Sequence, residues 1–264
     1  MVRSAAAPTR KSPGATVSAT LAKFALTAIL LIAAGAVDAR AEPLASACSK
    51  TYAPQTLDNT QPLNLGQLKN QLYFYACSGA YDRDLNKVAG KAQAYVAMRA
   101  AQVAKPALVL DIDETSLSNL PVELADDFAY LPQNIPCKRA MKDPCGFDNW
   151  VEAAWAKPID GTLALFNLAK AHHVSVFFIT GRHENQEDVT VKNLKAAGYE
   201  EWAGLTLRPQ GDNRSVIAYK FAAREKIAEQ GFTIIANVGD QHSDLAGGYA
   251  ERAYKLPNPF YYIP

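Results

Sequence analysis

Short, continuously apolar runs alternate with segments of helical spacing from residue 107 onward in this 264-residue chain. The apolar runs are residues 107–111, 174–180, 205–207 and 233–238, and the helical segments are 162–170, 187–197 and 215–230. A short run without polar alternation is typical of a strand that is buried on both faces of a sheet. Because these runs alternate with helices, the sequence predicts an α/β fold: a doubly wound parallel sheet with helices on both faces.

Two long segments do not belong to this alternation. Residues 68–103 have helical spacing that Gly79 and Gly90 weaken, so we expect an N-terminal helical extension of two or more helices. Residues 116–158 are rich in proline and aromatic residues and separate the first predicted strand from the next helix. An insertion of this length is too long for a simple connection, and we expect it to form a small cap.

The most apolar stretch, residues 24–37, is shorter than the roughly 20 residues that a membrane-spanning helix needs. Basic residues precede it, and Ala39-Arg40-Ala41, a small-residue cleavage site, follows it. This pattern is typical of a secretory signal peptide, with an uncleaved anchor as the alternative. We therefore expect an exported protein, periplasmic or secreted, with no stable membrane span after cleavage. Its predicted parts are the signal peptide 1–41, an arm with the helical extension 42–105, and a core 106–264 that contains the cap.

Export would place the four cysteines in an oxidising compartment, where disulfides form. Four cysteines allow three pairings, and the sequence does not choose among them. The local pair Cys137 with Cys145 is favoured, and Cys48 with Cys77 would then tie the arm to the first helix. A zinc site is less favoured, because no CxxC pair and no neighbouring histidine is present. A lipid anchor at Cys48 is also less favoured, because charged residues separate this cysteine from the apolar stretch.

The charges of the chain are nearly balanced. The formal net charge is +1, and the loss of residues 1–41 would leave a small negative charge. Nucleic-acid-binding proteins usually carry a basic surplus, so we expect no nucleic-acid partner. The chain also has no GxGxxG and no Walker A motif, which argues against a dinucleotide-binding or P-loop protein.

Polar residues gather where the predicted strands end. These residues are Asp111-Ile112-Asp113-Glu114-Thr115, Thr180-Gly181-Arg182 and Gly239-Asp240-Gln241-His242-Ser243-Asp244. Ligands of open parallel sheets bind at the carboxyl ends of the strands, so these segments should share one rim. Lys220 and Arg224 follow each other at a spacing of four residues, which places two cations on one face of a helix.

Such a rim has the groups that phosphoryl transfer requires. Several aspartates together need a cation, and hard oxygen ligands suit Mg²⁺. One carboxylate can attack phosphorus, and a second carboxylate two residues along can protonate the leaving oxygen and then activate water. A lysine and a threonine hydroxyl can bind the phosphoryl oxygens and stabilise the developing charge.

The same residues resemble the motifs of a known family. VLDIDETSLSN with Asp111 and Asp113, FFITGR with Thr180, and VGDQHSDL with Asp240 and Asp244 are similar to motifs I, II and IV of haloacid dehalogenase-like phosphatases. The resemblance is closer to subfamily IIIB, which contains the bacterial class B and class C acid phosphatases and the plant vegetative storage protein-like acid phosphatases. YKFAAREKIAEQGFTIIANVGDQHSDLAGG and the ending KLPNPFYYIP resemble the plant-type and class C pattern in particular. The similarity extends from about Leu68 to the C-terminus.

The resemblance implies a role for each of the four motif aspartates. Asp111 would be the nucleophile and a Mg²⁺ ligand. Asp113 would be the general acid and base, and its backbone carbonyl would also bind the metal. Asp240 would ligate Mg²⁺, and Asp244 would support the ligands around it.

The resemblance also implies how the phosphoryl group is bound. Thr180 would hold its oxygens, Gly181 would offer a backbone N–H, and Lys220 would neutralise phosphate and nucleophile as the motif III lysine. Lys226 is a rival for Lys220, but the neighbours of Lys220 match better. His242 stands where plant-type members often carry an aromatic residue, so no role is implied for its side chain.

The implied activity is that of an exported, Mg²⁺-dependent acid phosphatase that hydrolyses phosphomonoesters through an aspartyl-phosphate. Nucleoside monophosphates are candidate substrates on the evidence of relatives alone. The alternatives are a phosphotransferase on the same fold and a catalytically weak storage or binding protein. An enzyme is favoured because the chain keeps the aspartate at position 111 together with the other motif residues. We expect Arg182 and Arg224 to be ion-pair partners rather than substrate ligands.

Overall fold

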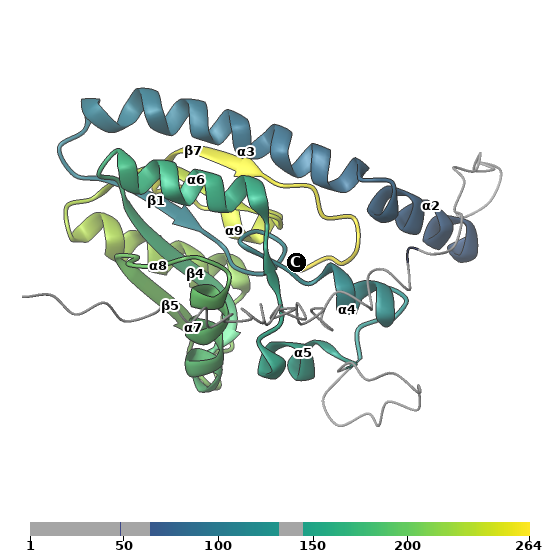
Figure 1. The fold of residues 1–264 in the computed structure, drawn as a ribbon. Helices are drawn as coiled ribbons and strands as arrows, with labels where there is room; N and C mark the ends of the chain where they lie inside the picture. The colour runs from purple at the N-terminus through teal and green to yellow at the C-terminus, as the bar shows by residue number, and fades with distance from the viewer. Residues whose placement is uncertain (1–47, 49–63, 132–144) are drawn as a thin grey trace, which may run out of the picture. The chain divides into compact units, whose positions relative to one another are not determined.

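The computed structural model of the chain describes residues 48, 64–131 and 145–264, and its fold is shown in Figure 1. Its main sheet has five strands in the order β5-β4-β1-β6-β7. These strands are β1 (Pro106–Leu110), β4 (Ser175–His183), β5 (Gly204–Arg208), β6 (Thr233–Gly239) and β7 (Ala250–Lys255). All neighbouring strands are parallel, and the chain winds outward from β1 in both directions. The predicted doubly wound parallel sheet is therefore confirmed.

Helices cover both faces of this sheet (Figure 1). Helices α3 (Ala80–Arg99) and α6 (Asp160–Ala171) pack on one face, and α8 (Val216–Glu229) packs on the other. All five residues of β1 are buried, because Leu108 and Leu110 face the first layer while Ala107 and Val109 face the second. Burial on both faces explains why this strand has an uninterrupted apolar sequence.

Local sequence signals set the ends of several helices. Ser215 caps α8 through its side chain, which accepts a hydrogen bond from the Ala218 N–H at 3.2 Å. Gly198 follows α7 (Glu187–Ala196) with a φ of +92°, and Gly231 follows α8 with a φ of +84°. Glycine adopts this left-handed conformation without steric cost, so both residues suit the turns that end these helices.

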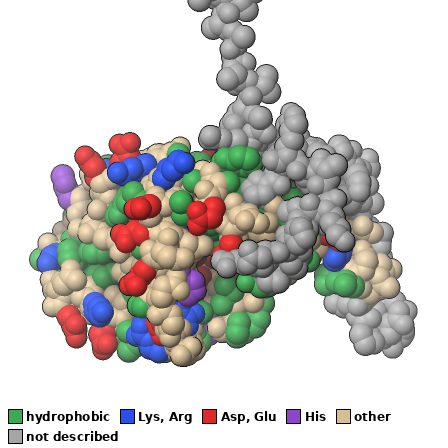
Figure 2. Space-filling model, turned by 90° about the horizontal axis from the view of Figure 1, so that it is seen from below, with side chains coloured by type: hydrophobic (Ala, Val, Ile, Leu, Met, Phe, Trp, Pro, Cys, Tyr) green, Lys and Arg blue, Asp and Glu red, His purple; other side chains and the backbone are tan. Residues whose placement is uncertain are grey.

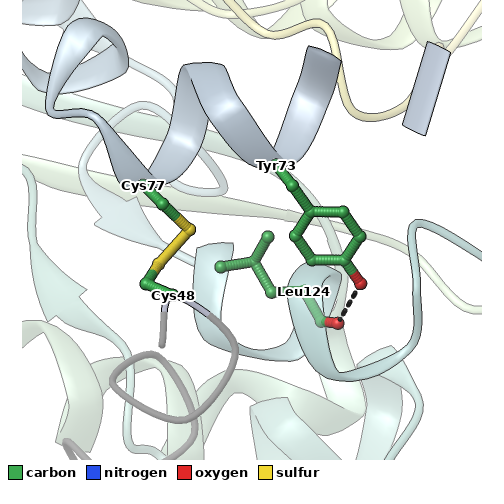
Figure 3. The surroundings of a disulfide bond; sticks show 4 residues. All are labelled: Cys48, Tyr73, Cys77 and Leu124. Carbon is green, nitrogen blue, oxygen red and sulfur yellow. Dashed lines mark hydrogen bonds between the residues drawn. A yellow bond between two sulfur atoms is a disulfide. The ribbon is translucent and has the colours of Figure 1, made fainter. Parts of the chain in front are cut away.

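The predicted helical extension consists of α2 (Leu65–Cys77) and α3. Cys48 and Cys77 form a disulfide, and the Tyr73 hydroxyl of α2 donates to the Leu124 carbonyl at 3.0 Å (Figure 3). The predicted Cys48–Cys77 pair is thus confirmed, and the lipid alternative is wrong because the sulfur of Cys48 is bonded to Cys77. The other expected pair includes Cys137, which lies outside the described residues, as does the predicted signal peptide.

The described part of the segment predicted to form a cap contains two short helices, α4 (Leu120–Ala125) and α5 (Phe147–Ala153). Its two short strands, β2 (Leu117–Ser118) and β3 (Lys157–Pro158), pair antiparallel and connect the two ends of the insertion. Among the described residues, the remaining helical elements are α9 (His242–Leu245), η2 (Ala100–Gln102) and η3 (Glu184–Gln186). Within the described ranges, no helix has the length and apolar character that crossing a membrane would require.

Acidic and basic side chains are interspersed over the visible face in Figure 2. On the described part of that face, neither sign forms a continuous field. This distribution agrees with the nearly balanced charge of the sequence.

Candidate active site

Three aspartates meet at the carboxyl ends of β1 and β6. Asp111 directly follows β1, Asp240 directly follows β6, and Asp244 lies in α9. One carboxylate oxygen from each lies within 4.8 Å of the other two, and all three residues are buried. They converge because β1 and β6 are neighbours, and the Asp111 N–H extends their pairing by donating to the Val238 carbonyl at 3.0 Å.

Lys220 links two of these aspartates. Its ammonium donates to Oδ1 of Asp111 and, at 2.7 Å, to Oδ1 of Asp244. Burial lowers the pKa of Lys220, but the charges of Asp111 and Asp244 outweigh burial and raise the pKa above its ordinary value. Lys220 is therefore positively charged at every pH at which the protein is expected to work.

The cluster carries more negative charge than Lys220 neutralises. Burial raises the pKa of Asp111 well above its ordinary value; Lys220 opposes this rise, and Asp244 and Asp240 add to it. Burial and the nearby Asp244 also raise the pKa of Asp240. A divalent cation would relieve this repulsion, and a set of carboxylate oxygens fits a hard cation such as Mg²⁺.

Asp113 is held apart from this cluster by a different set of partners. Arg182 of β4 donates to its carboxylate from Nη2 at 2.7 Å and from Nε at 3.1 Å, as expected for an ion-pair partner. Asn119 donates to the same carboxylate at 2.9 Å, and its own Oδ1 accepts from the Trp150 indole at 2.9 Å. Strand β4 and the insertion together therefore fix the direction of the Asp113 side chain.

The loop after β1 is held by hydrogen bonds to its buried polar groups. Glu114 has a φ of +48°, and its carboxylate accepts from the Tyr81 hydroxyl of α3 and from the Asn119 backbone N–H. Burial raises the pKa of Glu114 to about 8, although both hydrogen bonds oppose the rise.

The next two residues of this loop also bond to the site. Thr115 donates to Oδ1 of Asp240 at 3.0 Å, and Ser116 donates to the Asp111 carbonyl at 2.6 Å. These contacts lock the loop that carries Asp111 and Asp113.

Thr180 and Gly181, the two residues of β4 that were expected at the site, differ in their position relative to the cavity. Gly181 lines the cavity beside the aspartates, and nothing lies within 4 Å of where a Cβ would stand. Thr180 is completely buried, and its hydroxyl accepts from the Arg182 N–H at 3.1 Å. The structure thus brings Gly181 together with Asp111, Asp113, Lys220, Asp240 and Asp244 at the cavity, and it does not bring Thr180 to the cavity surface.

A cavity of about 520 Å³ opens from these side chains. The insertion contributes Val122, Phe128 and Phe147 to its lining, and the C-terminal segment contributes Tyr261 and Tyr262. Glu123 also lines it, and burial, with Asp126 and Asp113, raises the pKa of Glu123 to about 7. The cavity is large enough for a small organic molecule beside the carboxylate cluster.

Sequence reasoning missed the side chains that position the cluster. Tyr81, Asn119, Trp150, Gln241 and Asn258 all bond to acidic residues of the site or to their direct partners. Neither spacing nor residue type singles them out, because they come from separate elements. Three of them lie within segments that belong to the resemblance: Asn119 in VLDIDETSLSN, Gln241 in VGDQHSDL and Asn258 in the ending KLPNPFYYIP.

A parallel α/β sheet with buried aspartates and a lysine at its carboxyl rim defines a class of phosphoryl-transfer proteins. Comparison with family models narrows this class: the model of the HAD superfamily, subfamily IIIB (acid phosphatase), matches residues 36–264, and the chain belongs to this family. This result confirms the resemblance found in the sequence and the prediction of a phosphoric monoester hydrolase.

The chain is also similar to plant proteins, and three of them illustrate the identity and coverage. The chain is 35% identical over 192 residues to acid phosphatase 1 of Solanum lycopersicum, and the aligned region covers 72% of each protein. It is 36% identical over 176 residues to a stem 28 kDa glycoprotein of Glycine max, covering 65% of this chain and 66% of that protein. It is 32% identical over 157 residues to vegetative storage protein 1 of Arabidopsis thaliana, covering 59% of this chain and 55% of that protein.

Among solved structures, the class C acid phosphatase from Bacillus anthracis has a similar fold. The TM-score is 0.57 at 23% sequence identity, and the match covers 74% of this chain and 86% of that chain. At this identity, the comparison supports the fold alone.

Proposed function

We propose that the protein is an exported, Mg²⁺-dependent acid phosphatase that hydrolyses small phosphomonoesters through an aspartyl-phosphate on Asp111. The observation that carries this proposal is the meeting of Asp111, Asp240 and Asp244 with Lys220 at the wall of a cavity. Family membership supports the reaction, and the arrangement of the buried charges supports the assignment of roles.

In the first step, the Asp111 carboxylate attacks phosphorus. A bond forms between the Asp111 oxygen and phosphorus, and the bond from phosphorus to the leaving oxygen breaks. Asp113 gives its proton to that oxygen, so the alcohol leaves neutral. Lys220 holds Oδ1 of Asp111 and Arg182 holds Asp113, which keeps both carboxylates oriented before substrate arrives.

In the second step, water releases phosphate. Asp113 takes a proton from water, the water oxygen bonds to phosphorus, and the bond to Asp111 breaks. Asp113 is then protonated and Asp111 is again a free carboxylate, so the cycle can restart. Transfer to an added alcohol instead of water would make the same intermediate serve a phosphotransferase.

The chain's own residues would hold the cation and the phosphoryl group. Asp111, the backbone carbonyl of Asp113, and Asp240 would hold Mg²⁺, while Asp244 keeps Lys220 in place. When bound, the cation supplies positive charge that stabilises the transferred phosphoryl oxygens. Lys220 and the open backbone at Gly181 would contact those oxygens. Thr180 would support this contact from behind the cavity wall, through its bond to the backbone of Arg182.

Export is supported by the disulfide and by the N-terminal sequence pattern. Disulfides persist in oxidising compartments, and Cys48 is bonded to Cys77. The cavity volume of about 520 Å³ fits small phosphoesters, including a nucleoside monophosphate. A second candidate function, storage with weak catalysis, is favoured only by the similarity to vegetative storage protein 1 of Arabidopsis thaliana.

Purified protein that lacks residues 1–41 tests the proposal with p-nitrophenyl phosphate and Mg²⁺. Asp111→Asn should abolish turnover, and Asp113→Asn should lower kcat by about 10²–10⁴-fold, the usual contribution of general acid–base catalysis. Asp188→Asn, an exposed aspartate in the first turn of α7, is the matched control and should keep wild-type activity. Full activity of Asp111→Asn would overturn the mechanism.

Removal of the cation tests the second part of the proposal. EDTA should stop turnover, and Mg²⁺ should restore it, because the buried carboxylates lack enough positive charge without a cation. Undiminished turnover in a sample shown to be free of metal would contradict Mg²⁺ dependence. A wild-type protein that binds Mg²⁺ but turns over no phosphomonoester would instead favour storage.

A further inference from the structure

We infer that Asn258 is a positioning residue that orients the Asp240 carboxylate for cation binding, so that the C-terminal segment 256–263 is a working part of the site. This inference rests on the proposed function, because it assigns Asp240 to the cation. Asn258 lies after β7, the last strand, and is not itself a ligand in the assignment above.

The hydrogen bonds of Asp240 distinguish its two oxygens. Oδ2 accepts from Asn258 Nδ2 at 2.8 Å and from Gln241 Nε2 at 2.7 Å. Oδ1 accepts only from the Thr115 hydroxyl, at 3.0 Å, among the described residues. A carboxylate oxygen has two lone pairs in its plane, so Oδ2 is fully used whereas Oδ1 keeps one lone pair. Asn258 and Gln241 thereby leave Oδ1 as the oxygen that is available to a cation.

Asn258 is itself held in one orientation. Its Oδ1 accepts from the Phe260 N–H at 2.9 Å, which directs its Nδ2 toward Asp240. The ring of Phe260 is buried. The Tyr81 ring packs edge-on against it with 4.9 Å between the ring centroids, and the Phe128 ring stacks on it with 5.6 Å between the centroids. An amide suits this position because it accepts at one end and donates at the other.

The rest of the segment is attached to the same loop of the site. The Leu256 N–H donates to the Gly239 carbonyl at 2.9 Å, the Ile263 N–H donates to Gln241 Oε1 at 3.2 Å, and the Ser243 hydroxyl donates to the Ile263 carbonyl at 3.2 Å. In Figure 1 the segment after β7 turns back toward the strand ends and finishes near the loop that follows β1. Several contacts therefore attach the segment, but within the described residues only Asn258 joins it to the Asp240 carboxylate directly.

Calorimetric titration with Mg²⁺, without substrate, tests the inference on the chain without residues 1–41. Asn258→Ala should weaken Mg²⁺ binding by about tenfold or more, as is typical when a hydrogen-bond partner of a metal ligand is removed. Ser243→Ala is the matched control: it removes another attachment of the segment without touching Asp240, and it should leave Mg²⁺ binding unchanged. At saturating Mg²⁺, kcat of Asn258→Ala should return toward the wild-type value, because the chemistry itself does not use Asn258.

Three outcomes would overturn the inference, and they differ in meaning. A dissociation constant for Mg²⁺ that differs by less than twofold between Asn258→Ala and the wild type would contradict the inference. The proposed function would stand in that case, because the wild-type protein still binds Mg²⁺. An equal loss in Ser243→Ala would show that attachment of the segment matters in general and Asn258 has no special part. Absence of Mg²⁺ binding in the wild type would overturn the proposed cation and this inference with it.

A measurement on the wild type avoids the risk that a variant fails to fold. If Asn258 links the segment to the cation, binding of Mg²⁺ must in turn stabilise the segment, because coupling between two sites is reciprocal. Amide hydrogen exchange at Phe260, whose N–H is bonded to Asn258, should slow when Mg²⁺ is added. Exchange at Phe260 that is the same with and without Mg²⁺ would contradict the inference.

Discussion

The guanidinium of Arg182 donates to the carboxylate of Asp113 through both Nε and Nη2, and the Arg182 side chain is completely shielded from solvent. This two-pronged contact fixes the plane of the carboxylate as well as its position. Asp113 is therefore oriented by the core of the sheet before any substrate binds.

Arg182→Lys tests this relationship. Lysine keeps the charge but offers a single point of contact, so we expect kcat to fall by about tenfold or more while KM changes little. Arg99→Lys is the matched control, because Arg99 makes the same two-pronged contact with Glu251 far from the cavity lining, at 2.8 Å for each bond. Equal kcat for Arg182→Lys and the wild type would contradict the positioning role.

Gly239→Ala tests how tightly the cluster is packed. A Cβ on Gly239 would stand less than 3.0 Å from the Cβ and Cγ of Asp244, which leaves no room for it. We expect the free energy of unfolding to fall by ~1–3 kcal/mol, as for other overpacked cores. Gly90→Ala, in the interior of α3 with no atom within 4 Å, should instead raise it by ~0.5–1 kcal/mol. Urea titration measures both, and a stable Gly239→Ala protein would show that Asp244 can move.

Tyr81→Phe tests the buried contact between α3 and the loop after β1. Without the hydroxyl, the buried Glu114 carboxylate loses one of its donors, and we expect a loss of ~1–3 kcal/mol in the free energy of unfolding. Tyr75→Phe removes a similar bond, to Asp84 at 2.8 Å, but at an exposed position, so water can replace it at little cost. An equal decrease in the free energy of unfolding for the two variants would mean that the burial of Glu114 does not affect stability.

The raised pKa of Glu123 predicts how stability depends on pH. Burial, with Asp126 and Asp113 adding to it, raises this pKa from 4.5 to about 7 in the folded chain. Between these values the folded chain keeps a proton that the unfolded chain has lost, so stability is full below pH 4.5 and falls as pH rises through 7.

Glu123→Gln should remove this dependence. The variant should match the wild type near pH 4 and exceed it by ~3 kcal/mol at pH 8, since each pKa unit corresponds to about 1.4 kcal/mol. Glu152→Gln, an exposed glutamate on α5, should follow the wild type at every pH. Unfolding curves of wild type and Glu123→Gln that stay parallel from pH 4 to pH 8 would refute the prediction.

The sequence alone was sufficient to predict the buried strands and the rim of the sheet at which their polar ends meet. An apolar run such as residues 107–111 is typical of a strand that is buried on both faces, and parallel topology then brings Asp111 and Asp240 together. Strand β7 was not predictable, because it lies at the edge of the sheet and Glu251, Arg252 and Lys255 are exposed. Its sequence therefore lacks the apolar run by which the other strands were found.

The hydrogen-bond partners of the site residues could not be predicted from the sequence. Asp113 was expected at the site, but its bond to Asn119, and through Asn119 to Trp150, depends on how α5 folds back. Thr180 follows the motif, yet its hydroxyl faces the backbone of Arg182 because the strand continues beyond it to His183. Such details are set by tertiary packing and not by spacing along the chain.

The central position of β1 has a consequence for how the molecule is made. Both neighbours of this strand, β4 and β6, come much later in the chain, so β1 has nothing to pair with while it is being synthesised. Folds dominated by such distant pairings form slowly. A nascent chain that has not yet reached Asp244 has no complete carboxylate cluster, and during that time the protein has the nucleophile proposed here but no assembled site in which to use it.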